Sequence, residues 1–154
     1  MKHIFLLILA ALLLSPAGSS QIIKPVKWTF STRQADTEQV DLVFTATIAS
    51  PWHMYGLNIP EGGPIPASIQ FTDIKGFILI GKPTQSPKPE IVDDKIFNMK
   101  LELHDKQVVF TQRIKKSQRD SIFISGTLEY MTCSDMQCVM GDNDFEFKLK
   151  GLDR

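Results

Sequence analysis

The sequence predicts an all-β fold, an antiparallel β-sandwich, on three observations. Apolar and polar residues alternate with a period of two through most of the chain after residue 20, as in strands that have one face on a core and the other in water. No segment of this part keeps the 3.6-residue period of an amphipathic helix. Turn-forming residues separate the alternating segments. About seven to nine short strands divided by turns are typical of a β-sandwich.

The pattern in the first half of the chain predicts four strand regions and one loop. Weak alternation predicts a strand at about 26–32, and strict alternation follows over 40–48, where every second residue from Val40 is apolar. Residues 60–66 contain three prolines and two glycines. These residues cannot join the interior of a sheet, so we expect a loop there. Weaker patterns predict strands at about 68–73 and 77–82.

The second half continues the pattern. Residues 83–89 begin and end with proline, so we expect a second loop that leads to an acidic turn at 93–95. Leu101 and Leu103 predict the buried face of a strand at 99–104, which leaves His104 on the polar face in water. The remaining expected elements are strands at about 107–114, 122–130 and 145–150, and a third loop at 133–141.

The first 20 residues have the pattern of a secretory signal peptide. Lys2 and His3 form a basic start, residues 4–14 are an unbroken apolar run of 11, and small residues follow at 17–20. A membrane-spanning helix needs about 20 apolar residues, so this run is too short for a stable anchor. We therefore expect residues 1–20 to be cleaved, residues 21–154 to form one exported domain, and no membrane span to remain.

The charge balance and the motifs exclude several classes of function. The 17 Lys and Arg residues equal the 17 Asp and Glu residues, which does not favour nucleic acid or an anionic membrane surface as a partner. No Ser/His/Asp set, zinc-ligand spacing or phosphate-binding loop is visible. We therefore expect neither a metal nor a cofactor.

The two cysteines, Cys133 and Cys138, are separated by four residues. Such a lone pair in an exported protein is usually a disulfide. The bond would close a six-residue ring, and loop entropy assigns so small a ring only about 2 kcal/mol of stability. Stabilisation of the fold is therefore a weak explanation for this disulfide. The spacing alone nevertheless leaves both the structural and the redox-active interpretations open.

Four stretches of the sequence carry a resemblance to a known family. The stretches are Trp28-Thr29-Phe30, Trp52-His53-Met54-Tyr55 with the loop 60–66, Phe97-Asn98-Met99-Lys100, and the segment 129–138 with both cysteines. Through these stretches the chain resembles the N-terminal periplasmic domain of the DsbD family of thiol:disulfide interchange proteins, as a stand-alone version. The resemblance implies an immunoglobulin-like sandwich in which Cys138 forms the intermolecular bond and Cys133 resolves it. It further implies a cap of Asp93, Asp94 and Phe97 over the pair, with Tyr55 as a neighbour.

The resemblance also implies the partners. Reducing equivalents would pass through the pair to or from envelope thioredoxin-like proteins or disulfide isomerases. Because the chain ends at Arg154, we expect a separate membrane protein as the electron donor. The sequence leaves open whether the chain counts as an enzyme of the protein-disulfide reductase type or as an electron-transfer component.

Two other functions remain open at this stage. Met131, Met136 and Met140 flank the cysteines, and soft sulfur ligands suit Cu(I), so a copper-binding envelope protein is one alternative. A non-catalytic interaction module with a structural disulfide is the other.

Overall fold

The computed structural model describes residues 23–95 and 97–152, so the signal-peptide prediction for residues 1–20 lies outside the described part. Within these residues the chain forms ten strands and no helix, hence no helix long and apolar enough to cross a membrane. The strands are β1 (Val26–Gln34), β2 (Gln39–Ile48), β3 (His53–Tyr55), β4 (Ser68–Phe71), β5 (Phe77–Ser86), β6 (Glu90–Asp94), β7 (Met99–Asp105), β8 (Gln107–Lys116), β9 (Ile122–Cys133) and β10 (Cys138–Leu149).

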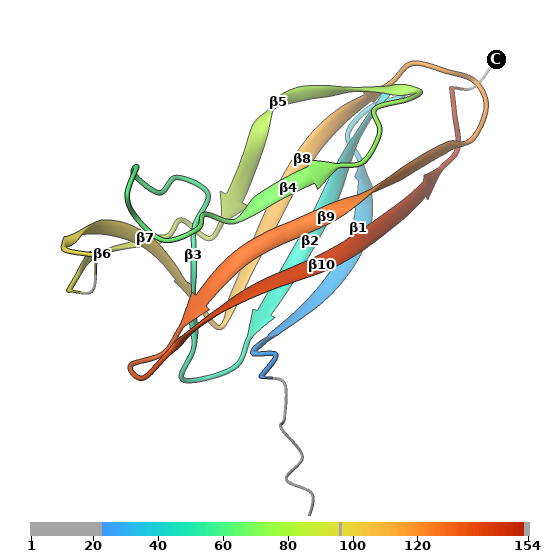
Figure 1. Ribbon diagram of the computed structural model, residues 1–154. Coiled ribbons are helices and arrows are strands. Elements are labelled where there is room, and N and C mark those ends of the chain that lie inside the picture. The colour runs from blue at the N-terminus through green and yellow to red at the C-terminus, as the bar shows by residue number, and fades with distance from the viewer. Residues whose placement is uncertain (1–22, 96, 153–154) are drawn as a thin grey trace, which may run out of the picture.

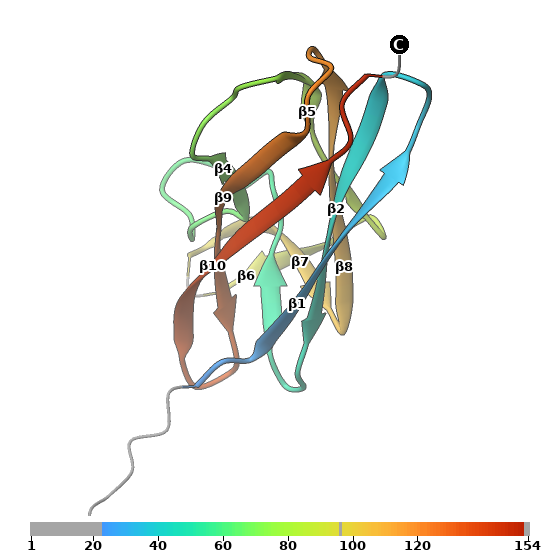
Figure 2. The same cartoon turned by 90° about the vertical axis from the view of Figure 1, so that its right-hand side faces the viewer.

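The strands form two sheets that pack face to face (Figures 1 and 2). One sheet has four strands in the order β1-β2-β8-β5. The other has the order β10-β9-β3-β7-β6, and β4 also pairs with β9. Every pairing is antiparallel. The predicted all-β, antiparallel fold class is therefore confirmed.

The core between the sheets follows the predicted alternation. In β2, Val40 and every second residue to Ile48 are buried. The Phe44 ring lies edge-on against Phe145, with 4.9 Å between ring centroids, and against Phe147, at 5.5 Å. Aromatic pairs in this geometry add about 0.5–1.5 kcal/mol each beyond the burial of their area. Phe44 therefore joins the two sheets at the centre of the core.

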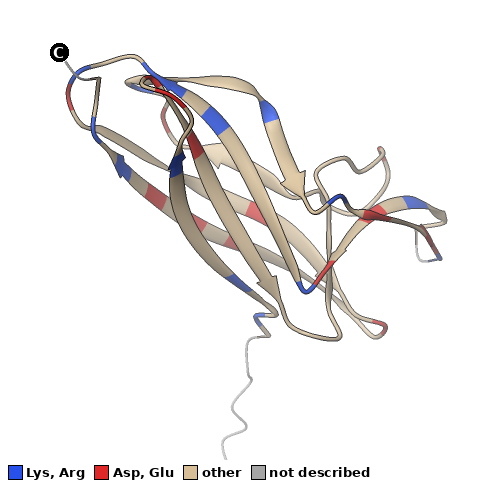
Figure 3. Cartoon of the chain, turned by 180° about the vertical axis from the view of Figure 1, so that it is seen from behind, with Lys and Arg blue, Asp and Glu red and all other residues tan. Residues whose placement is uncertain are grey.

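Charged residues of both signs are interspersed over the strands (Figure 3). On the four-stranded sheet, Asp41 alternates with the core residues of β2 but is buried as well. Its carboxylate accepts hydrogen bonds from Arg33 at 2.8 Å and from Arg113 at 2.7 Å. The hydrogen bond from Arg113 is the largest cause that holds the pKa of Asp41 below its usual value. The two long arginine side chains cover the short aspartate, so the outer face of a sheet can still contain a buried charge.

Three loop or turn predictions were partly wrong. Strand β5 continues to Ser86, through Pro83, although residues 83–89 were expected to be a loop. Pro83 is tolerated because β5 is an edge strand and a register shift interrupts its pairing between Ile80 and Thr84. The predicted acidic turn at 93–95 begins later, because Asp93 and Asp94 still belong to β6. The cysteine loop is also shorter than residues 133–141, since both cysteines belong to strands.

The prediction that His104 is solvated was wrong. Leu101 and Leu103 lie on the outer face of the six-stranded sheet, under a second apolar cluster described below. His104 therefore faces inward, where its side chain is buried and its Nε2 lies 3.1 Å from Gln85 Oε1. Other residues pack against both faces of β7, the second apolar cluster on the outer face and the core on the inner face. Alternation in the sequence does not show which face of such a strand meets the main core.

His104 should make the stability of the fold depend on pH. Burial lowers the pKa of His104 below its usual 6.5, although Glu102 and Asp105 oppose the shift. The unfolded chain therefore takes up this proton more readily than the folded one. The stabilising contribution is complete above about pH 6.5, is lost as the pH falls through that value, and levels off once folded His104 is also protonated.

Urea unfolding at about pH 7.5 and pH 5.5 measures this effect. We expect the free energy of unfolding to fall between the two pH values, and to fall less in His104→Gln. An equal fall in both proteins would show that other groups cause the pH dependence.

Candidate functional site

The two cysteines lie at the tip of the β9–β10 hairpin. Cys133 ends β9, Cys138 begins β10, and the two are direct partners in the ladder. They form a disulfide, with 4.0 Å between their Cα atoms. The backbone N–H of Ser134 donates to the carbonyl oxygen of Gln137 at 2.9 Å and closes the four-residue turn between them. The expected bond within the pair is thus present, and the hairpin holds both sulfurs together.

The two cysteines differ strongly in exposure. Cys133 is 1% exposed, whereas Cys138 is exposed. Cys133 is shielded because β9 is an inner strand, with β10 on one side and β3 on the other. Cys138 is on β10, which is an edge strand of the same sheet. A molecule from solvent therefore reaches the disulfide from the side of Cys138.

A second apolar cluster, here called the cap cluster, covers Cys133 on the outer face of the sheet. Its buried members are Tyr55, Leu101 and Cys133, and the partly buried residues packed against them are Ile59, Phe97, Met99, Leu103 and Met131. The cluster is separate from the main core. It draws on β3, β7, β9 and the segments that follow β3 and β6, which all lie at one end of the molecule (Figure 1).

A hydrogen-bonded tyrosine organises the cap cluster. The Tyr55 hydroxyl donates to Asp94 Oδ2 at 3.3 Å, and Asp94 Oδ1 accepts the backbone N–H of Phe97 at 3.0 Å. The Phe97 ring lies edge-on to Tyr55, with 6.2 Å between centroids. Burial, followed by the charge of Asp94, raises the pKa of Tyr55 to about 12. Tyr55 therefore remains a neutral donor at physiological pH and ties β3 to the β6–β7 connection.

The segment after β3 is held against the sheet by Glu102. The backbone N–H of Asn58 donates to Glu102 Oε2 at 3.0 Å, and Gln85 Nε2 donates to the same oxygen at 2.6 Å. Burial disfavours the charge, but these hydrogen bonds hold the pKa of Glu102 below its usual value. Gly56 allows the close approach, because a Cβ atom there would lie 2.5 Å from Glu102 Oε2. This network positions the segment that leads into the loop 60–66 beside the cap cluster.

Most of the residues expected at the site are brought together, but one is not. Cys133, Tyr55 and Phe97 share the cap cluster, Cys138 is bonded to Cys133, and Asp94 is hydrogen-bonded to Tyr55. Asp93 is the residue that is not brought to the site. It lies in β6 immediately before Asp94, so its side chain lies on the opposite face of the strand, where it is exposed. Sequence reasoning missed Leu101 as a residue of this site, because its alternation was attributed to the main core.

Further sulfur and imidazole groups lie beside the disulfide. His53 pairs with Cys133 in the β3–β9 ladder, and Met131 pairs with Met140 in the β9–β10 ladder. His53 is therefore a neighbour of Cys133 on the adjacent strand. The described residues contain no group of three or more His, Cys, Asp or Glu side chains that could hold a metal ion.

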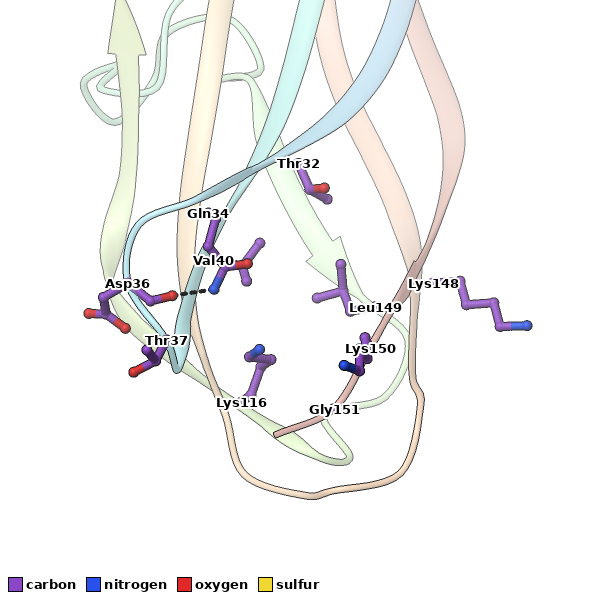
Figure 4. A pocket seen from close by; sticks show the side chains of 10 residues that line it. All are labelled: Thr32, Gln34, Asp36, Thr37, Val40, Lys116, Lys148, Leu149, Lys150 and Gly151. Atoms are coloured by element: carbon purple, nitrogen blue, oxygen red, sulfur yellow. Dashed lines mark hydrogen bonds between the residues drawn. The ribbon is translucent and has the colours of Figure 1, made fainter. Parts of the chain in front are cut away.

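A pocket of about 590 Å³ lies at the opposite end of the sandwich (Figure 4). Lys116, Lys148 and Lys150 line it together with Asp36. It contains neither of the cysteines, so it does not contribute to chemistry at the disulfide.

Comparisons with known proteins agree with this geometry. The family model described as "Thiol:disulfide interchange protein DsbD, N-terminal" matches residues 19–150. Among solved structures, the N-terminal periplasmic domain of ScsB from Proteus mirabilis has a TM-score of 0.61 and 21% identity, and the match covers 87% of this chain and 52% of that one. The N-terminal domain of DsbD from Neisseria meningitidis, in the reduced form, has a TM-score of 0.54 and 18% identity, with 90% and 96% covered.

This chain therefore matches only about half of the ScsB structure. No curated protein matched the chain. The likeness to the two structures confirms the predicted immunoglobulin-like fold class. The family model covers nearly all of the described residues, and both cysteines lie within the match. The chain belongs to the family of N-terminal domains of the thiol:disulfide interchange protein DsbD.

Proposed function

We propose that this protein is an exported thiol–disulfide exchange protein. It passes reducing equivalents through Cys133 and Cys138 to or from thioredoxin-like proteins of the cell envelope. The observation that carries the proposal is the disulfide at the tip of a hairpin, with one cysteine exposed and the other buried. Family membership supports the same chemistry.

Exchange proceeds in two displacements at sulfur. A thiolate of a reduced partner attacks Cys138 Sγ, the intermolecular disulfide forms, and Cys133 leaves as a thiolate. The second thiolate of the partner then attacks the partner sulfur that is bonded to Cys138 Sγ. This displacement releases Cys138 as a thiolate. The partner ends as a disulfide, and this chain ends as a dithiol that has gained two electrons and two protons.

The forward transfer uses the same two sulfurs in reverse. Cys138 attacks the disulfide of an oxidised acceptor, and Cys133 then attacks Cys138 Sγ and releases the reduced acceptor. Cys133 can resolve the bond without moving far, because it faces Cys138 across the ladder. The roles of the two cysteines therefore follow from their positions: the exposed sulfur meets the partner, and the buried one completes the transfer.

The turn between the cysteines contains no basic side chain, and its one charged residue is Asp135. A negative charge disfavours a nearby thiolate. In this proposal the partner therefore supplies the activated thiolate when the disulfide is reduced. The cap cluster, with Tyr55, Asp94 and Phe97, keeps other thiols away from Cys133. Asp93, which the family resemblance places in the cap, lies exposed on β6 and would contribute only charge at its edge.

The proposed location is the periplasm, reached through the signal sequence predicted in residues 1–20. The similar ScsB structure is described as an N-terminal periplasmic domain, which supports this location. The proposed partners are thioredoxin-like proteins or disulfide isomerases on one side and a membrane electron donor on the other.

Trapping of the mixed disulfide tests this function. In Cys133→Ser the intermolecular bond forms but no resolving thiol remains, so a covalent complex with a thioredoxin-like envelope protein should accumulate. Cys138→Ser leaves only the buried thiol and should accumulate little or none. The measurement is non-reducing gel electrophoresis of envelope extracts, followed by mass spectrometry of any band that reductant removes.

Other results would change the assignment. A complex from Cys138→Ser alone would exchange the two roles but keep the redox function. No complex from either variant would favour an interaction module with a structural disulfide.

A further inference from the structure

The hairpin places two pairs of sulfur atoms next to each other. Cys133 pairs with Cys138 and Met131 pairs with Met140, two positions further along the same ladder. Side chains two residues apart on a strand lie on the same face of the sheet, about 6.8 Å apart. Residues directly opposite each other have Cβ atoms about 4.5–5.5 Å apart. The four side chains therefore occupy the corners of one small rectangle on the outer face.

The methionines of this rectangle are accessible from the same side as the exposed cysteine. Met140 is 67% exposed on the edge strand β10, although it is a large apolar residue. Met131 is half-buried against the cap cluster that contains Cys133. Met136, at the tip of the turn, is 94% exposed and lies outside the ladder. None of these three methionines belongs to the main core.

We propose that the reduced hairpin binds one Cu(I) ion through the thiolates of Cys133 and Cys138 and the thioethers of Met131 and Met140. Thiolate and thioether sulfur are the soft ligands that select Cu(I) in proteins. The methionine side chain has three rotatable bonds, so each thioether can turn toward a metal between the cysteines. The ladder register brings the four donors together before the metal arrives, which reduces the entropy lost on binding.

Binding depends on the redox state of the pair. A dithiol reductant gives two electrons and two protons to the Cys133–Cys138 bond and itself becomes a disulfide. Cu(I) then displaces the two thiol protons and keeps its own oxidation state. In the oxidised protein each cysteine sulfur is bonded to the other, so no thiolate is present. The site therefore exists only in the reduced protein, and this inference goes beyond the exchange function proposed above.

Competition with a coloured Cu(I) chelator, bicinchoninate, tests the site. The protein is reduced chemically, freed of reductant without oxygen, and titrated with Cu(I), so the result does not depend on any exchange partner. We expect one Cu(I) per reduced chain and none for the oxidised chain, for Cys133→Ser or for Cys138→Ser. The variant Met131→Leu/Met140→Leu should weaken Cu(I) binding by about tenfold or more, a loss typical even of residues that only support metal ligands.

Two controls separate the thioethers from a general effect on the hairpin. Met136→Leu is the same substitution outside the rectangle and should leave Cu(I) affinity unchanged. Zn²⁺ is bound by thiolate, imidazole and carboxylate rather than thioether, so Met131→Leu/Met140→Leu should bind Zn²⁺ as the unaltered protein does. The inference is overturned if reduced and oxidised chains retain Cu(I) equally, if neither retains it, or if the double methionine variant binds Cu(I) with unchanged affinity.

Discussion

In the reduced protein, iodoacetamide should alkylate Cys138 about 10²-fold faster than Cys133. Cys138 is exposed, whereas Cys133 is 1% exposed under the cap cluster. Cys133 reacts only when the cap cluster opens locally. An opening that costs about 3 kcal/mol reduces the accessible fraction by about 10²-fold. The measurement is the rate of modification of each cysteine, followed by mass spectrometry of the digested protein.

This comparison requires that the reduced domain remains folded. The six-residue ring contributes about 2 kcal/mol by loop entropy, which is a small part of the stability of a domain of this size. In about 8 M urea the difference should fall to within a few-fold, because both thiols are then in the solvent. Equal rates without urea would contradict the burial of Cys133 and the roles proposed for the pair.

Phe44→Ala should lower the free energy of unfolding by about 3–5 kcal/mol, as expected for truncation of a fully buried aromatic side chain. Phe44 is 0% exposed and packs against Phe30, Phe145 and Phe147. The substitution leaves a cavity where the two sheets meet, and it removes three edge-on aromatic contacts. Urea unfolding followed by circular dichroism measures the loss.

Phe123→Ala is the matched control. Phe123 is 69% exposed, and Lys148 Nζ lies 5.3 Å from its ring centroid. Such an exposed cation–π pair contributes about 0.5–1 kcal/mol, so this variant should lose no more than that. Losses of similar size in the two variants would contradict the position of the core.

The sequence predicted the strands best where alternation is strict and one face alone meets the core. Residues 40–48 and 122–130 behaved in this way, and the apolar residues at every second position from Val40 and from Ile122 are buried in the main core. The cysteine spacing also sufficed to predict the disulfide, because a bond between near neighbours depends only on a local turn. Strand β3 was missed, since three residues are too few to show alternation.

The candidate site could be predicted only in part. The family resemblance brought Tyr55, Asp94 and Phe97 to attention, and they do form one connected group. The sequence could not show whether Asp93 or Asp94 faces Tyr55, because the two aspartates are adjacent. It depends on the pairing of β6 with β7, which sets Asp94 opposite Met99 of the cap cluster.

The fold class and the bonded cysteine pair could be predicted from the sequence, because they depend on local alternation and on a short spacing. The sequence did not show that Leu101 packs against Cys133 in the cap cluster, or that His104 is buried on the opposite face of β7. The physical reason is that alternation shows which residues share a face of a strand. What packs against each face depends on contacts with segments far away in the sequence.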